Sequence, residues 1–125
     1  MSDALEVETT EWYEDEVLAL PRPDQDRINR RLGALPRKGW NAAIRDGTVS
    51  PLRDGIHELR VPGRGSAYRI LFFLAPGRTP RLVVLTTCAT MELMKKRQGM
   101  DAEIERAKWR RALWIEQQKR RTDER

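Results

Sequence analysis

The sequence predicts an α+β domain with a small antiparallel sheet, an N-terminal helical pair and a C-terminal helix, in the order β-α-α-β-β-β-α. One reason is a group of three apolar segments separated by short stretches rich in Gly and Pro. The other is a helical spacing of apolar residues before and after that group. At 125 residues, with 39% hydrophobic and 34% charged side chains, the chain has the size of one small domain. We expect residues 1–125 to form that domain, with residues 120–125 as a frayed, charged tail.

The predicted sheet is centred on three strands at residues 56–61, 67–74 and 81–87. They are rich in Val, Ile, Leu, Phe and Tyr, which suit a pleated, half-buried surface. The linkers at residues 62–66 and 75–80 supply the Gly and Pro of two turns. Three strands alone are marginal, so the helices should cover them.

An edge strand and a helix are expected before this sheet. Residues 5–9 alternate apolar side chains with glutamates, which indicates a strand. Thr9 or Thr10 can cap a helix at residues 11–20, whose acidic first turn suits the helix dipole. Its buried stripe consists of Tyr13, Val17 and Leu20.

A second helix is expected at residues 24–35, because Pro21 and Pro23 end the first one. It should lie beside the first helix on one face of the sheet. Its inner face consists of Ile28, Leu32 and Leu35.

The segment between this helix and the sheet predicts a loop. Pro36 and Gly39 should stop the helix, and residues 39–50 should form the loop, with Trp40 packed inward as its anchor.

The C-terminal part predicts one long helix. Residues 90–99 fit either a short helix or a loop, and Asp101 is the expected N-cap of a helix at residues 102–119. One arc of that helix carries Ile104, Ala107, Ala112, Trp114 and Ile115. Trp109 and Leu113 form a second apolar strip, which either packs on the helical pair or receives a partner.

Composition excludes several classes of protein. The acidic N-terminus has no apolar core segment of a signal peptide, and no apolar run is long enough for a membrane helix. One Cys and one His make neither a disulfide framework nor a usual zinc site, and no phosphate-loop or dinucleotide motif is present. We therefore expect a cytoplasmic protein without a metal or other cofactor.

Charge is distributed unevenly along the chain. Residues 1–19 carry seven acidic side chains and no basic one, whereas the whole chain has a net charge of +5. The basic remainder would attract a polyanion such as RNA or an acidic protein. An inert, highly charged surface is the alternative interpretation.

Two arginines inside predicted strands are the main candidates for a site. Alternation along a strand places Glu58 and Arg60 on one face and His57 on the other. On the next strand, Arg69 and Tyr68 point to opposite faces in the same way. The arginines either form structural pairs, for example with Glu58, or together bind phosphate. His57 and Tyr68 fit either packed core residues or proton carriers.

The motif L-x-D-G-I-x-E-L-R at residues 52–60, followed by a Gly-bearing turn and Y-R-I-L-F-F at residues 68–73, resembles the RelE/ParE toxin superfamily. The resemblance is greatest to its HigB-like, phage Gp49-like branch. It implies a RelE-like fold and the toxin of a type II toxin–antitoxin pair. Most such toxins cut messenger RNA on the ribosome, whereas ParE-type members inhibit gyrase.

The resemblance also implies roles for individual residues in a metal-independent endoribonuclease that inhibits translation. Arg60 and Arg69 would stabilise the charge that develops on phosphate, and Glu58, His57 or Tyr68 would carry protons. The implied partners are mRNA, the ribosome and a helix-turn-helix or acidic antitoxin. The antitoxin would bind at Trp109 and Leu113. The alternatives are a gyrase inhibitor or an inactive, phage-derived accessory protein that binds nucleic acid. The expected RNA contacts are Arg53, Arg64, Lys95, Lys96 and Arg97.

Overall fold

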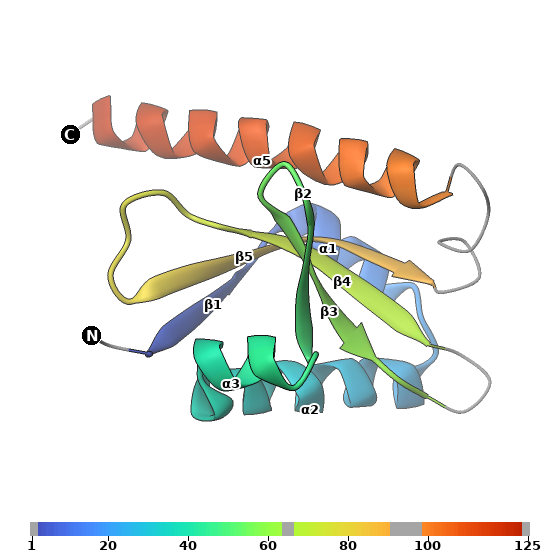
Figure 1. Ribbon diagram of the computed structural model, residues 1–125. Helices are drawn as coiled ribbons and strands as arrows, with labels where there is room; N and C mark the ends of the chain where they lie inside the picture. Colours follow the sequence, from blue (N-terminus) through green and yellow to red (C-terminus); the bar gives the residue numbers. More distant parts are fainter. Residues whose placement is uncertain (1–2, 64–66, 91–98, 124–125) are drawn as a thin grey trace.

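The computed structural model describes residues 3–63, 67–90 and 99–123 as a five-stranded mixed sheet between helices (Figure 1). The strands lie in the order β1-β5-β4-β3-β2. Helices α2 and α3 cover one face, and α5 runs across the other (Figure 1). This confirms the predicted α+β class. The order of the described elements is β-α-α-α-β-β-β-β-α, with one more helix and one more strand than predicted.

The N-terminal elements are confirmed. Strand β1 (Leu5–Thr9) is an edge strand and pairs in parallel with β5. Helix α1 (Glu11–Leu18) is capped by Thr10, whose hydroxyl accepts a hydrogen bond from the Tyr13 backbone N–H at 3.4 Å. The same hydroxyl donates to the carbonyl of Leu85 in β5 at 2.8 Å, so the cap also attaches α1 to the sheet.

Helix α2 (Arg22–Lys38) is longer at both ends than predicted. Pro23 lies in its first turn, where a missing N–H costs nothing because that group has no partner in a helix. The helix also continues through Pro36, so the prediction that this proline stops it is wrong. Only two residues follow Pro36 before Gly39, which has a φ of 87° and ends the helix.

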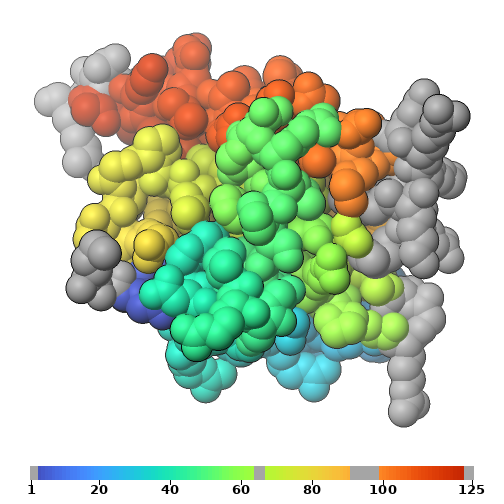
Figure 2. Space-filling model, in the orientation of Figure 1, coloured from blue at the N-terminus to red at the C-terminus, as the bar shows by residue number. Residues whose placement is uncertain are grey.

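The predicted loop at residues 39–50 is wrong. It contains helix α3 (Trp40–Arg45), and strand β2 (Val49–Arg53) begins within it. Strand β2 includes Pro51, at a register irregularity, and forms the outer edge of the sheet, the place where a proline is tolerated in a strand. Figure 2 shows this edge at the surface, between α5 and α3.

The central meander is confirmed. Strands β3 (Ile56–Val61), β4 (Tyr68–Leu74) and β5 (Arg81–Thr90) pair antiparallel in sequence order. The pairing of β4 with β5 shifts between Leu71 and Phe72.

The sheet separates two hydrophobic clusters. The first joins the sheet to α1, α2 and α3, and its larger members include Tyr13, Ile28, Leu35, Leu59, Ile70 and Phe72. The second joins the opposite face to α5, and its members include Ile56, Leu71, Phe73, Ile104, Ala107 and Trp114. Strands β3, β4 and β5 therefore bury alternate side chains on opposite faces, as the period of two requires.

Helix α5 (Gly99–Asp123) extends beyond its predicted bounds. Asp101 lies inside its first turn rather than at the N-cap, and residues 120–123, expected in the frayed tail, are helical. The segment at residues 91–98, for which a short helix or a loop was expected, lies outside the described residues. Within the described part of the chain, no helix is long and apolar enough to cross a membrane.

Candidate functional site

Arg60 and Arg69 lie directly opposite each other on β3 and β4. They share the α5 face of the sheet with Glu58, whose side chain is only 2% exposed. The Arg69 guanidinium nitrogen Nη1 lies 2.9 Å from Glu58 Oε2, and Arg60 Nε donates a hydrogen bond to Glu58 Oε1 at 3.2 Å. The structure therefore brings together three of the five residues predicted to act in catalysis.

The two arginines differ in exposure. The Arg69 side chain is 14% exposed, whereas that of Arg60 is 56% exposed. A buried carboxylate needs compensation, and Arg69 supplies it from within the fold. The group carries two positive charges for one negative charge. The outward charge of Arg60 is thus available to an external anion.

His57 lies on the opposite face of the sheet from the arginines. Its ring stacks on Phe72 with 5.4 Å between centroids and meets the edge of Trp40 at 5.4 Å. Burial lowers the pKa of His57, because the charged form is poorly solvated there. His57 is half-buried and packs against core residues, which fits the interpretation of a packed histidine, and Trp40 packs inward as predicted.

Tyr68 also lies on that opposite face. Its hydroxyl donates to Asp24 Oδ2 in α2 at 2.5 Å, and Asp24 also pairs with Arg27. The hydrogen bond from Tyr68 is the main cause that lowers the pKa of Asp24, with Arg27 contributing. Tyr68 therefore links the sheet to α2, and the structure does not place it with Arg60 and Arg69.

Of the residues expected to contact RNA, Arg53 lies in the part of the chain that the structure describes. Arg53, at the end of β2, pairs with Asp101 of α5, and its Nη2 lies 3.7 Å from Glu105 Oε2. It therefore joins the sheet edge to α5. The other expected contacts, Arg64, Lys95, Lys96 and Arg97, lie outside the described residues.

The second apolar strip of α5 is divided by the fold. Trp109 is 63% exposed, whereas Leu113 is half-buried. Packing against the helical pair, one of the two predicted uses of this strip, does not cover Trp109. Its indole remains accessible on the described surface.

A charged cluster that the sequence did not reveal joins α1, β5 and α5. Arg110 Nη1 donates to Glu16 Oε1 at 2.9 Å and to the Thr86 carbonyl at 2.8 Å, and the Cys88 N–H donates to the same Glu16 oxygen at 3.1 Å. One signal was present in the sequence. Arg110 follows Ala107 by three residues and precedes Trp114 by four, so it belongs to the buried face of the helix.

Glu103 extends this cluster along α5. It is 3% exposed and accepts two hydrogen bonds from Arg106 Nη1, at 3.0 and 3.2 Å. Burial raises the pKa of Glu103, although Arg106 and Arg110 oppose that effect. The cluster fixes α1 and α5 to β5. Its cations are occupied by internal acceptors, which leaves the Arg60–Glu58–Arg69 group as the better candidate for binding an anion. No group of His, Cys, Asp and Glu in the described part of the chain has the arrangement of a metal site.

Comparison with known proteins identifies one family. The family described as "Phage derived protein Gp49-like (DUF891)" matches residues 15–112, which include β2 to β5, both arginines and the first half of α5. No curated protein and no solved structure matches the chain.

Proposed function

Because this chain belongs to the phage-derived Gp49-like family, a toxin-like family of the RelE/ParE-like superfamily, we propose that it is a toxin that cleaves messenger RNA on the ribosome. The observation that carries the proposal is the Arg60–Glu58–Arg69 group. It presents a partly exposed guanidinium, held by a buried carboxylate, on two paired strands of the sheet.

The chemistry needs no metal ion. The 2′-hydroxyl of one nucleotide attacks the adjacent phosphate and displaces the 5′-oxygen of the next nucleotide. Negative charge grows on the phosphate oxygens, and cations placed there stabilise it, with a loss of about 10²–10³ in rate when one such donor is removed. In this proposal Arg60 contacts the phosphate, and Arg69 keeps Glu58 neutralised and Arg60 oriented.

Glu58 is a positioning residue in this scheme. Both of its oxygens face arginines, at 3.2 and 2.9 Å, so it holds the cations rather than a substrate proton. His57 and Tyr68 face the opposite side of the sheet. In this proposal, water or a group of the ribosome therefore accepts the proton of the 2′-hydroxyl and supplies one to the leaving 5′-oxygen.

A second candidate is a binder that does not cleave RNA, such as a gyrase inhibitor or an accessory protein that binds nucleic acid. The observation that favours it is that both oxygens of Glu58 face arginines, while His57 packs on Phe72 at the opposite face of the sheet.

Mapping of 5′-hydroxyl RNA ends after brief induction in bacteria separates these functions. The test variant is Arg60→Gln, because Arg60 is exposed and its loss leaves the Arg69–Glu58 pair intact. The matched control is Arg45→Gln, an exposed arginine on α3 at the other face. The proposal expects new ends inside translated frames with the wild type and the control, and few with Arg60→Gln. Growth arrest without new ends would refute cleavage and favour the gyrase inhibitor.

A further inference from the structure

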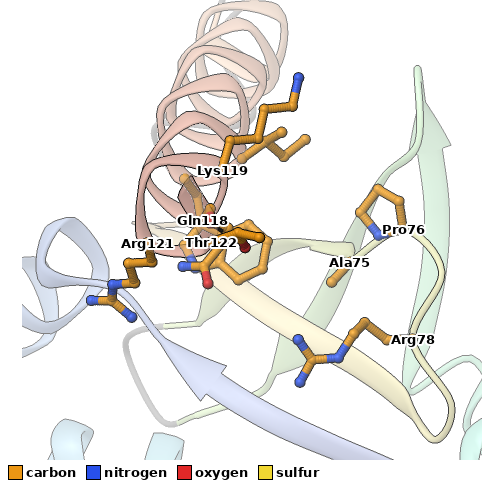
Figure 3. Close-up of a pocket in the computed structure, with 9 residues that line it drawn as sticks. Ala75, Pro76, Arg78, Gln118, Lys119, Arg121 and Thr122 are labelled. Carbon is orange, nitrogen blue, oxygen red and sulfur yellow. Dashed lines mark hydrogen bonds between the residues drawn. The ribbon is translucent and has the colours of Figure 1, made fainter. Parts of the chain in front are cut away.

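A hollow lies between the turn that joins β4 to β5 and the C-terminal half of α5. Its volume is about 640 Å³. Figure 3 shows the turn with Pro76 and Arg78 facing Gln118 and Thr122 of the helix. The lining residues are Ala75, Pro76, Arg78, Trp114, Ile115, Gln118, Lys119, Arg121 and Thr122.

The charged side chains that line this hollow, among the described residues, are cations. They are Arg78, Lys119 and Arg121, and no acidic residue of the described chain lines it. All three are exposed, and none forms an ion pair with another side chain in the part of the protein that the structure describes. By contrast, Arg53, Lys108 and Arg110 are paired. The carbonyls at the C-terminus of α5 carry a partial negative charge, which these cations outweigh.

The inner wall of the hollow is apolar and fixed. Trp114 is 7% exposed, its ring meets Phe73 edge-on at 5.5 Å, and its Nε1 donates to Glu8 Oε2 at 2.8 Å. Glu8 and Glu11 line a neighbouring hollow, which shares Trp114, Gln118 and Arg121 with this one. Ile115 and Ala75 complete the wall. In Figure 3 the Arg78 guanidinium is turned toward the helix, whereas Lys119 and Arg121 leave the helix on different sides.

This hollow is separate from the Arg60–Glu58–Arg69 group. Arg69 is the second residue of β4, and the hollow begins just after the last residue of that strand. At a rise of about 3.3 Å per residue, the two lie about 17 Å or more apart along β4.

We propose that this hollow binds one nucleotide unit of single-stranded RNA. Its apolar wall takes the base, Arg78 takes the phosphate of that unit, and Lys119 and Arg121 at the rim take flanking phosphates. Stacking of a base on a protein surface and phosphate contacts with cations are the two interactions by which single strands bind without sequence readout. The choice of RNA as ligand rests on the proposed function.

The test is binding of a fluorescent RNA octamer, measured by anisotropy at several salt concentrations, without ribosomes. The test variant is Arg78→Gln/Lys119→Gln/Arg121→Gln. The matched control is Arg30→Gln/Arg37→Gln/Arg45→Gln, which removes the same charge from exposed positions on α2 and α3. Each phosphate contact with a single strand contributes about 0.7 to the slope of log affinity against log salt, so the test variant should lower the slope by about 2. Equal slopes for the two variants, or no binding by the wild type, would overturn the proposal.

A second arm tests whether the hollow takes a base as well as phosphate. Inorganic polyphosphate of eight units is compared with the unlabelled octamer as a competitor. Stronger competition by RNA is expected, and equal competition would reduce the site to a plain anion site and overturn the assignment of the base. Both arms are independent of cleavage. Missing 5′-hydroxyl ends in cells would refute the proposed function alone, whereas equal slopes would refute the nucleotide site alone.

Discussion

Glu58→Gln is the substitution whose effect on folding follows most directly from the structure. It keeps the size of the side chain and removes the negative charge that lies 2.9 Å from Nη1 of Arg69, whose side chain is only 14% exposed. Removal of one partner from a buried ion pair costs about 3–5 kcal/mol in the free energy of unfolding. We expect about 3 kcal/mol, at the lower end, because Gln can still accept one hydrogen bond.

The ion pair between Arg60 and the same carboxylate should contribute little to the free energy of unfolding. Its side chain is 56% exposed, so water screens the pair and Arg60→Gln should cost at most about 1 kcal/mol. Urea unfolding of the wild type and both variants at pH 7 measures the two values. The ratio between them tests the assignment of a structural role to Arg69 and an outward role to Arg60.

Two results would contradict this reasoning. If the free energy of unfolding of Glu58→Gln lies within about 1 kcal/mol of the wild-type value, the carboxylate is not desolvated to the extent that its burial implies. If Arg60→Gln costs as much as Glu58→Gln, the fold depends on both arginines equally, and Arg60 is not free to serve an external phosphate.

Three further predictions concern pH and backbone conformation. Tyr68→Phe should lower the stability at pH 7, because it removes the main hydrogen bond that depresses the pKa of Asp24. The difference in stability between wild type and variant should shrink as the pH falls below 3.8, the usual pKa of Asp, because the carboxylate is then protonated and this stabilisation is lost. Urea unfolding at pH 7 and pH 3 measures the difference. Glu103→Gln should raise the stability at pH 7, because it removes a charge that burial penalises. This gain in stability should vanish below pH 4.5, because a carboxylate with a raised pKa destabilises the fold only where it is ionised. A gain at pH 3 as large as that at pH 7 in urea unfolding would contradict this cause. Gly33→Ala should raise the free energy of unfolding by about 0.5–1 kcal/mol, because a Cβ at this position of α2 has free space around it. Gly39→Ala should destabilise the protein, because Gly39 has a φ of 87° and its Cβ would meet the Asp3 carboxylate. Thermal unfolding compares the two variants, and effects of the same sign would refute the distinction.

The parts of the fold that the sequence predicted are those set by local chemistry. The meander was predictable because Gly and Pro separate three apolar runs, and a strand period of two placed Arg60 and Glu58 on one face. Helix α3 was missed because six residues give too little periodicity, and β2 because Pro51 argues against a strand unless its edge position is known.

Pairing between distant segments could not be predicted in the same way. The register that sets Arg60 opposite Arg69 depends on how the strands pair, and a shift of one residue would have moved Arg69 to the other face. The bond from Tyr68 to Asp24 spans 44 residues, and that from Arg110 to Glu16 spans 94. Such contacts depend on helix placement, which no local pattern fixes.

The pairing of two arginines with one carboxylate resolves a conflict between folding and binding. A lone arginine on the sheet would either be buried at high cost or be free to move, and neither state presents a fixed cation to a phosphate. Here Arg69 compensates Glu58 inside the fold, so Glu58 can orient Arg60 without requiring it for neutrality. In the proposed function, a phosphate can therefore bind Arg60 while the buried pair of Glu58 with Arg69 remains. The arrangement thus orients Arg60 toward an external anion. The protein loses little folding stability if Arg60 pairs with that anion instead of Glu58.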